Sequence, residues 1–210
     1  AFRPFRELPP KGKILDPLEP LDYAFIAFNK LVTTLFVYHA YSYVWSSDHV
    51  EWDMGKITFA NVFGSLVGFY LLYDLCYTNF HRLLHVRGLY KHIHKHHHRQ
   101  MAPFRGTYDA INVHPFEFLV GEYLHLLCVV LVPSHVVAIV IFVSLDGVFA
   151  SLNHTRFDVI IPGIFNVKAH DTHHHNPNVN FGQYLMFWDR VFGTYKKHWQ
   201  DGGVLDKLEN

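Results

Sequence analysis

Three long apolar runs without an acidic or basic residue dominate the chain. They cover residues 31–47, 57–73 and 123–145, and the third is interrupted by Pro133. A membrane-spanning helix needs about 20 mostly apolar residues, and proline ends or kinks a helix near the residue that precedes it. The first two runs therefore predict one helix each once their apolar flanks are added, and the third predicts two helices joined by a tight turn.

The runs together predict four helices in two antiparallel pairs. The expected boundaries are 24–45, 57–80, 116–132 and 135–152. A soluble all-α protein with buried core helices would show similar runs, but half of the residues are hydrophobic and only 17% are charged, a low charged fraction for a soluble domain. The expected fold class is an all-α integral membrane protein with four transmembrane helices in two hairpins and a histidine-rich helical cap. Lys30 and Asp74 should then face protein or lie near a helix end.

Basic and acidic residues are unevenly divided between the connecting segments. The stretch from His81 to Tyr108 holds six basic residues and no acid, whereas the short connection 46–56 has three acids and one lysine. The excess of Lys and Arg marks the cytoplasmic side of a membrane protein, so the cap, the N-terminal arm and the C-terminus are expected in the cytoplasm. Formal net charge is zero, which gives no indication of a nucleic-acid partner.

The rest of the chain suggests one domain with two short extensions. Residues 1–20 are basic and rich in proline, without the apolar core of a signal peptide, and are expected to form an irregular arm. We expect the domain to span 21–200 and a tail to follow at 201–210. Cys76 and Cys128 lie in apolar surroundings and form no CxxC motif, so neither a disulfide framework nor a zinc ribbon is expected.

Histidine is the residue type that indicates chemistry. The chain has 18 histidines, and three groups show helical spacing: HRLLH at 81–85, HKHHH at 94–98, and HDTHH at 170–174. Side chains three or four residues apart share one face of a helix, and neutral imidazole is the commonest ligand for transition metals. Histidine tags are terminal, whereas these groups are internal and repeat one spacing. They predict two metal ions, or one ion with a supporting shell.

These motifs resemble the three histidine boxes of the fatty acid hydroxylase/sterol desaturase superfamily of membrane-bound di-iron oxidases. The boxes read HxxxH, HxxHH and HxxHH, and the closing segment NFGQYLMFWDRVFGTY at 180–195 is similar to the family's own. The resemblance covers about residues 20–197. Two single histidines, in NVHPFE and NHTRFD, fall where the family tends to have one. The resemblance implies these metal ligands: His81, His85, His94, His97, His98, His114, His154, His170, His173 and His174.

The resemblance also implies a reaction and its partners. It implies a di-iron oxygenase that hydroxylates a C–H bond of a sterol or fatty-acyl lipid, with two iron ions as cofactors and zinc in their place in recombinant protein. Electrons would come from cytochrome b5 or a ferredoxin with its reductase. A eukaryotic enzyme of this kind would lie in the endoplasmic reticulum membrane with its active site in the cytoplasm. The sequence shows no haem-attachment motif and no flavin fingerprint of its own.

Other functions fit parts of the pattern. A desaturase of the same superfamily, of the sterol C5 type, and a carotenoid hydroxylase use similar boxes, and a zinc-dependent membrane hydrolase or a metal transporter would also contain clustered histidines. A transporter should carry its ligands inside the spanning helices, whereas the strongest clusters here lie beyond the helix ends. Acidic residues that could orient the ligating imidazoles are Asp158 and Asp171, together with Asp74, Glu117, Glu122 and Asp189. Histidines expected outside the metal site are His39, His49, His92, His96, His125, His135, His175 and His198.

Overall fold

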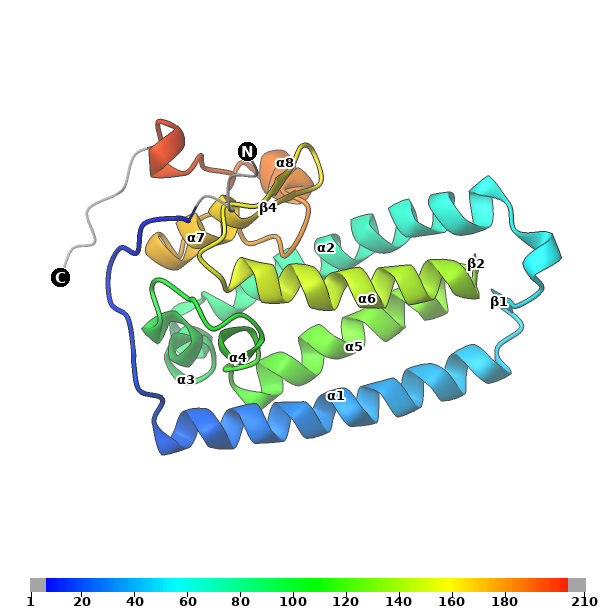
Figure 1. The fold of residues 1–210 in the computed structure, drawn as a ribbon, viewed down its shortest axis with the longest axis horizontal. Helices are drawn as coiled ribbons and strands as arrows, with labels where there is room; N and C mark the ends of the chain where they lie inside the picture. Colours follow the sequence, from blue (N-terminus) through cyan, green and yellow to red (C-terminus); the bar gives the residue numbers. More distant parts are fainter. Residues whose placement is uncertain (1–6, 204–210) are drawn as a thin grey trace, which may run out of the picture.

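Four long helices run along the long axis of the molecule, and the remaining elements gather at one of its ends (Figure 1). The computed structural model describes residues 7–203. The long helices are α1 Pro20–Ser46, α2 Ser65–Leu84, α5 Pro115–Leu131 and α6 Val136–Asn153. This mostly helical fold confirms the predicted all-α class, and each helix lies within a few residues of its expected range, apart from the later start of α2.

The short elements form a cap over one end of the four helices and tie together the other end. At the far end, β1 pairs in parallel with β2, so the connection between α1 and α2 is joined to the one between α5 and α6. At the cap end, β3 and β4 form an antiparallel pair. The short helices and strands are β1 Val50–Glu51, η1 Met54–Lys56, the π-helical turn η2 Ala60–Gly64, α3 Arg87–His92, η3 His94–Arg99, α4 Thr107–Ala110, β2 Ser134–His135, β3 Ile160–Ile161, β4 Phe165–Asn166, α7 Val167–His175, α8 Phe187–Phe192 and η4 Trp199–Asp201.

The helices do not pack in the order of the chain. α1 packs mainly on α5, and α2 packs on α5 and α6. The long connection 47–64 allows this arrangement because it can cross the end of the bundle, whereas the tight turn after Pro133 keeps α5 and α6 adjacent (Figure 1). The two helices of the first predicted hairpin, α1 and α2, therefore do not pack mainly on each other, because α5 lies between them.

Local sequence signals explain where the helices begin. Pro20 is the first residue of α1, and Glu19 and Asp22 form a capping box, in which the Glu19 N–H donates to the Asp22 carboxylate at 2.7 Å. α5 begins in the same way at Pro115, and the ring Nδ1 of His114 accepts the N–H of Phe116 at 3.2 Å. His135 caps α6 through the N–H of Val137. These two histidines thus satisfy helix N–H groups that would otherwise lack a partner.

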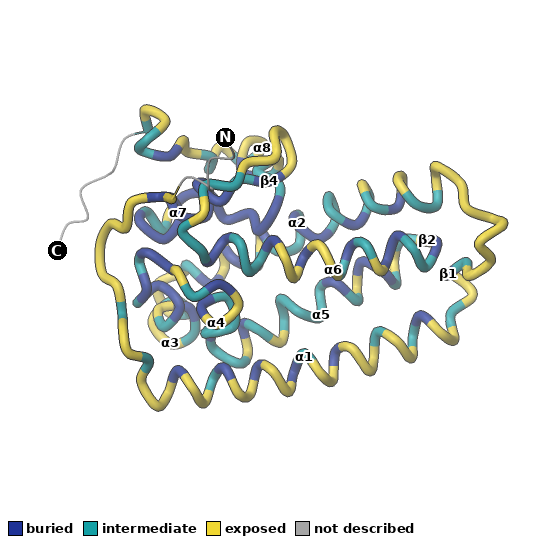
Figure 2. Tube along the Cα trace, in the orientation of Figure 1, coloured by how far each residue is buried: buried dark blue, intermediate teal, exposed yellow. Residues whose placement is uncertain are grey.

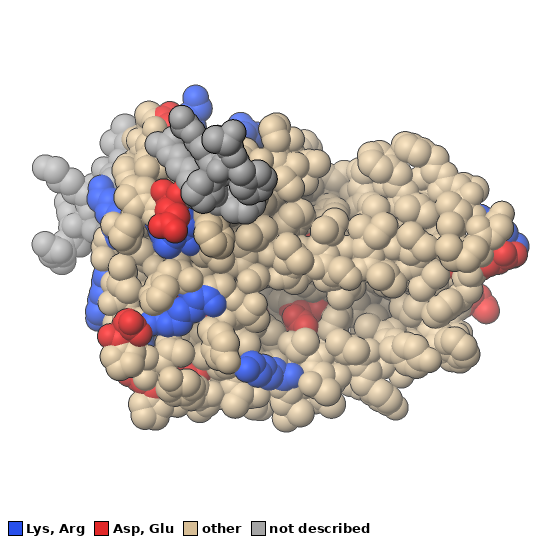
Figure 3. Space-filling model, in the orientation of Figure 1, with Lys and Arg blue, Asp and Glu red and all other residues tan. Residues whose placement is uncertain are grey.

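The outer faces of the long helices are apolar. α1 is exposed along much of its length, whereas buried residues gather near the cap (Figure 2). On the face shown in Figure 3, charged side chains lie mainly at the two ends, and the band between them is almost entirely uncharged. Exposed apolar side chains on the four helices include Leu31, Leu35, Tyr38, Trp45, Val67, Leu119, Leu127, Leu131, Val140 and Val148.

One helix in the described part of the chain is long and apolar enough to cross a membrane by length and hydropathy. This helix is α6, and 33% of its residues are buried, so it is not a fully enclosed core helix. The two charged residues noted in the sequence are accommodated. Asp74 faces protein and accepts the N–H groups of Tyr184 and Leu185, and the Lys30 ammonium lies 4.8 Å from the centre of the Tyr108 ring.

The predicted N-terminal arm runs without a helix from residue 7 to α1. Glu7 forms a single bridge with Phe157, and Leu8 is buried with 1% of its surface exposed. The arm therefore covers the cap. The first six residues of the predicted arm, and most of the predicted tail, lie outside the described residues.

Candidate metal centre

Nine of the ten predicted ligands converge at the cap end of the helices. His81 and His85 come from the end of α2, and His154 from the residue that follows α6. η3 and α7 supply the two boxes of the HxxHH type. The side chains form two groups. Within each group, the ring nitrogens that could bind metal lie within 4.8 Å of one another. Group A is His81, His85, His94, His98 and His173, and group B is His97, His154, His170 and His174.

Each HxxHH box is divided between the two groups. His94 and His98 belong to group A while His97 belongs to group B, and in α7 the assignment is reversed, with His173 alone in group A. On a helix, residues i+3 and i+4 point about 100° apart, so they can serve two neighbouring sites. η3 and α7 therefore lie between the two groups, and each contributes rings to both.

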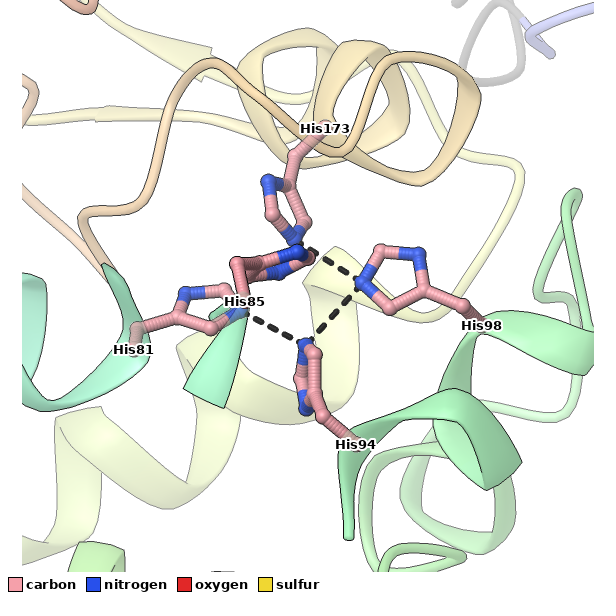
Figure 4. A group of neighbouring side chains, drawn as sticks. All are labelled: His81, His85, His94, His98 and His173. Carbon is pink, nitrogen blue, oxygen red and sulfur yellow. Dashed lines mark hydrogen bonds between the residues drawn. The ribbon is translucent and has the colours of Figure 1, made fainter. Parts of the chain in front are cut away.

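The five rings of group A meet from three directions, as Figure 4 shows for α2, η3 and α7. The Nε2 atoms of His81 and His94 lie 2.9 Å apart. The Nε2 of His98 lies 3.0 Å from that of His94 and 3.1 Å from that of His173. The Nε2 of His85 is buried and has no hydrogen-bond partner. Group B has the same short contacts, of 3.0–3.3 Å between Nε2 atoms.

Hydrogen bonds on the other side of the rings fix which nitrogen carries the proton. The Nδ1 of His81 donates to the Phe181 carbonyl at 2.8 Å, and the Nδ1 of His173 donates to the Val179 carbonyl at 2.7 Å. The Nδ1 of His94 lies 2.7 Å from the carboxylate Oε1 of Glu117. In a neutral ring with its proton on Nδ1, Nε2 has only a lone pair. The lone pairs of His81 and His94 therefore face each other.

Facing lone pairs repel unless a cation lies between them. A metal–nitrogen bond of about 2.1 Å separates two ligands at a right angle by about 3.0 Å, which matches the observed contacts of 2.9–3.1 Å in group A. The unpaired Nε2 of His85 supplies a further ligand atom. The residues of both groups therefore fit metal ions, held by nitrogen alone.

The rings are in the protonation state that metal binding requires. Burial, and to a smaller extent the neighbouring His81 and His154, lowers the pKa of His98 to about 3. Burial with the neighbouring His81 and His98 lowers the pKa of His85 to about 2. The pKa of His173 is also well below its ordinary value, first because the ring is buried. Neutral imidazole is the form that binds metal.

His114 does not join either group, which corrects the prediction of ten clustered ligands to nine. Its Nδ1 caps α5, and its ring packs against Phe25 with centroids 5.6 Å apart. The HPxE pattern marks the start of α5 here. The residue of that segment that contacts a clustered imidazole is Glu117. Its carboxylate was one of several candidate acceptors in the sequence, and among those it is the one that contacts a clustered imidazole.

Asp158 and Asp171 make other contacts than the ones expected. The Asp158 carboxylate lies 3.4 Å from the Lys168 ammonium. Asp171 accepts from Arg156 and lies 2.9 Å from the Nε2 of His198. Both acids therefore stabilise α7 and its surroundings through Lys168, Arg156 and His198 instead of through a ring of group A or B.

Backbone carbonyls are the supporting groups that sequence reasoning missed, because any residue type can supply them. The loop that carries the Phe181 carbonyl is held by Asp189, which accepts the N–H groups of Phe181 and Gly182 at 2.8 and 2.7 Å. Asn180 adopts a left-handed φ of 53°, a conformation that asparagine tolerates better than most residues. The family-like segment from 180 onward thus shapes the loop behind His81 and His173.

The remaining histidines stay outside both groups, as expected. His92 is exposed, and the Nε2 of His96 lies 2.9 Å from Asp22. His175 contacts the carbonyls of Lys11 and Asp171. His125 is buried in the bundle beside Asp146.

A cavity of about 310 Å³ adjoins the two groups. Rings from both groups line one end of it, namely His81, His97, His154 and His170. The rest of the wall comes mainly from α1, α2, α5 and α6, with further residues from α4 and the loops beside it and beside Tyr184. Most of that wall is apolar, with side chains such as Phe36, Val37, Val113, Phe118 and Val143. The geometry therefore places an apolar binding space directly against the two groups of imidazoles.

Comparisons with known proteins agree with this arrangement. The sequence model of the fatty acid hydroxylase family matches residues 66–194. The chain is 32% identical over 134 residues to methylsterol monooxygenase 1 of Rattus norvegicus. The matched region covers 61% of this chain and 45% of the relative. The chain is also 30% identical over 147 residues to cholesterol 25-hydroxylase-like protein 1, member 2, of Danio rerio, covering 66% and 52%.

A third relative is delta(7)-sterol 5(6)-desaturase of Leptosphaeria maculans, 33% identical over 125 residues, with coverage of 59% of this chain and 35% of the relative. The chain thus spans about half the length, or less, of the curated relatives it matches. No solved structure matches it.

Proposed function

Since the chain belongs to the fatty acid hydroxylase family, we propose that it is an oxidoreductase that hydroxylates a C–H bond of a lipid with dioxygen at two iron ions. The lipid is a sterol or a fatty-acyl chain. The observation that carries the proposal is the pair of adjacent groups, with nine imidazoles in all, because nine ligands exceed the coordination sphere of one ion. Their position against an apolar cavity fits a lipid substrate.

Group A would hold one iron and group B the other. Iron bound by neutral nitrogen ligands with an open position supplies the dioxygen reduction that cleavage of an unactivated C–H bond needs. A structural zinc site is closed with four ligands, so the five histidines of group A favour a metal of higher coordination number. Zinc can still fill the groups in recombinant protein, because affinity alone does not select iron.

The chain's own residues would position the ligands and the substrate. Glu117 and the carbonyls of Phe181, Val179 and Ala150 hold rings in place through Nδ1, at 2.7–2.8 Å, so the nitrogen atoms are oriented before metal binds. The apolar wall would align the lipid so that one carbon lies beside the rings of both groups.

We place the four long helices across a membrane. α1 has 27 residues, about 40 Å at 1.5 Å per residue, which exceeds the hydrocarbon thickness of about 30 Å. The apolar band in Figure 3 fits contact with lipid. The excess of Lys and Arg near the cap would put the metal centre in the cytoplasm, at the endoplasmic reticulum in a eukaryote, where cytochrome b5 or a ferredoxin with its reductase would dock.

Desaturation is the second candidate, because one of the relatives is named a sterol desaturase. Membranes containing the full chain, a reductant system and a lipid extract, supplied with isotopically labelled dioxygen, distinguish the two reactions. We expect label in a hydroxylated lipid. A new double bond without label would move the chain to the desaturase branch, and hydrolysis that depends on zinc and not on oxygen would reject both.

A further inference from the structure

The cavity has a polar end that the metal centre does not use. Far from the rings of groups A and B, its wall includes Glu122 and His125 of α5 and Asp146 of α6. Asp146 is 2% exposed and His125 is 9% exposed. On the face shown in Figure 3, the surface is hollowed between α1 and α6, and acidic atoms are visible inside the hollow.

The polar atoms at this end lack well-aligned partners. The Nε2 of His125 lies 3.1 Å from Oδ2 of Asp146, close enough for an ion pair, but neither that nitrogen nor either carboxylate oxygen of Asp146 has a partner with hydrogen-bond geometry. The Nδ1 of His125 donates to the Glu122 carbonyl at 3.0 Å. Buried polar groups are normally paired, and Oδ1 of Asp146, the oxygen outside the ion pair, is therefore positioned to accept a hydrogen bond from a ligand in the cavity.

Three helices place this end at the same distance from the metal centre. His125 follows Glu117, the partner of His94, by eight residues, and Asp146 precedes His154 by eight. On α2, Tyr73 precedes His81 by eight and also lines the cavity. Eight residues of helix measure about 12 Å.

The chemistry of the polar end selects among lipid head groups. A carboxylate is disfavoured because Glu122 and Asp146 both line this end. A hydroxyl fits, since it can donate its hydrogen to a carboxylate oxygen of Asp146 and carries no charge of its own. We propose that His125 and Asp146 bind a hydroxyl group of the lipid, and so select alcohols whose hydroxyl lies roughly 12 Å from the carbon that is oxidised. The proposal rests on the function proposed above.

The first test measures binding and needs no turnover. The full chain in detergent is heated with a sterol that has a free hydroxyl, with its methyl ether, and with a long-chain alcohol and the carboxylic acid of equal length. We expect each alcohol to raise the midpoint of unfolding, and the ether and the acid to require about 10- to 100-fold higher concentration for the same rise. Equal shifts for alcohol, ether and acid would overturn the proposal, even if no variant can be purified.

The second test uses Asp146→Asn and His125→Leu, with Ser65→Ala as the matched control. Ser65 is a buried polar residue of the same bundle that bonds the Pro133 carbonyl, at the end far from the cap. We expect both variants to keep two metals per chain, to lose the preference for alcohol over ether, and to oxidise more than one carbon. The control should keep the preference. Variants that keep the preference and a single product position would refute the polar end as the hydroxyl site.

The outcomes separate the two proposals. If the alcohol preference appears in binding but no oxidised lipid forms with metals present, the hydroxylase function fails and the hydroxyl site stands. If labelled products form equally well from alcohol and ether, the hydroxylase stands and the hydroxyl site fails. A preference for a lipid amine over the alcohol would also reject the hydroxyl site.

Discussion

Replacing Glu117 by glutamine tests whether a buried carboxylate sets the affinity of group A for metal. Its Oε1 lies 2.7 Å from the Nδ1 of His94, and the two side chains are only 6% and 1% exposed. Loss of such a supporting partner typically lowers metal affinity 10- to 100-fold. Glutamine retains an acceptor oxygen without the charge, so we expect metal affinity to fall about 10-fold, or about 1.4 kcal/mol. In Glu117→Ala the Nδ1–H of His94 has no acceptor, so we expect metal affinity to fall about 100-fold.

The metal-free protein should respond in the opposite direction. The second oxygen of Glu117 is buried without a hydrogen-bond partner, and an uncompensated buried charge is costly. Without metal, Glu117→Gln should therefore unfold at a temperature equal to or above that of the parent chain. With metal, it should unfold at a lower temperature.

The assay is competition between the loaded protein and a chelator, with metal per chain determined by elemental analysis. Asp158→Asn is the control, because its carboxylate pairs with Lys168, which also pairs with Asp201. The control should hold metal as tightly as the parent chain. Affinity for metal that stays within about two-fold in Glu117→Gln and falls in Asp158→Asn would refute the assignment of the supporting carboxylate.

The other predictions concern metal count, acid and topology. His97→Ala should lower metal content from about two ions to about one and abolish turnover, while His114→Ala keeps both; elemental analysis that finds two ions in the first variant contradicts separate groups. Because the pKa of His98 is about 3 in the folded chain and near 6.5 when unfolded, the metal-free protein should lose stability as pH falls from 6.5 towards 3, by up to about 1.4 kcal/mol per pH unit for each such histidine; urea unfolding that is equal at pH 7 and pH 5 contradicts this. Cysteine tags in Asp48–Lys56 and at His92 should label from opposite sides of the membrane, and labelling from one side rejects the four-span topology.

The sequence was sufficient to predict the four helices, because their runs are long and Pro133 separates two of them. It did not predict that α5 lies between α1 and α2. That order follows from side-chain packing and from a long connection, which leave no periodic signal. The later start of α2 has a local reason, since the π-helical turn at Ala60–Gly64 occupies residues that the apolar run assigned to the helix.

The candidate site was predictable as far as residue spacing carries it. Spacing and resemblance predicted the nine histidines that cluster, but His114 shows the limit, because a histidine before proline is equally suited to cap a helix. The choice of Glu117 among six acids depends on which side of α5 faces η3, and that is a tertiary property. The carbonyls of Phe181 and Val179 carry no residue signature at all.

The division of each box between groups A and B has a consequence for reading related sequences. In all three boxes, histidines four apart belong to the same group: His81 with His85, His94 with His98, and His170 with His174. In each HxxHH box the middle histidine, three residues after the first, belongs to the other group: His97 to group B and His173 to group A. In this chain an HxxxH spacing therefore marks two histidines of one group. An HxxHH box contains such a pair and one further histidine that belongs to the other group. Because the two HxxHH boxes contribute in opposite directions, a chain that loses His97 or His173 loses a member of the group to which the other box contributes two histidines.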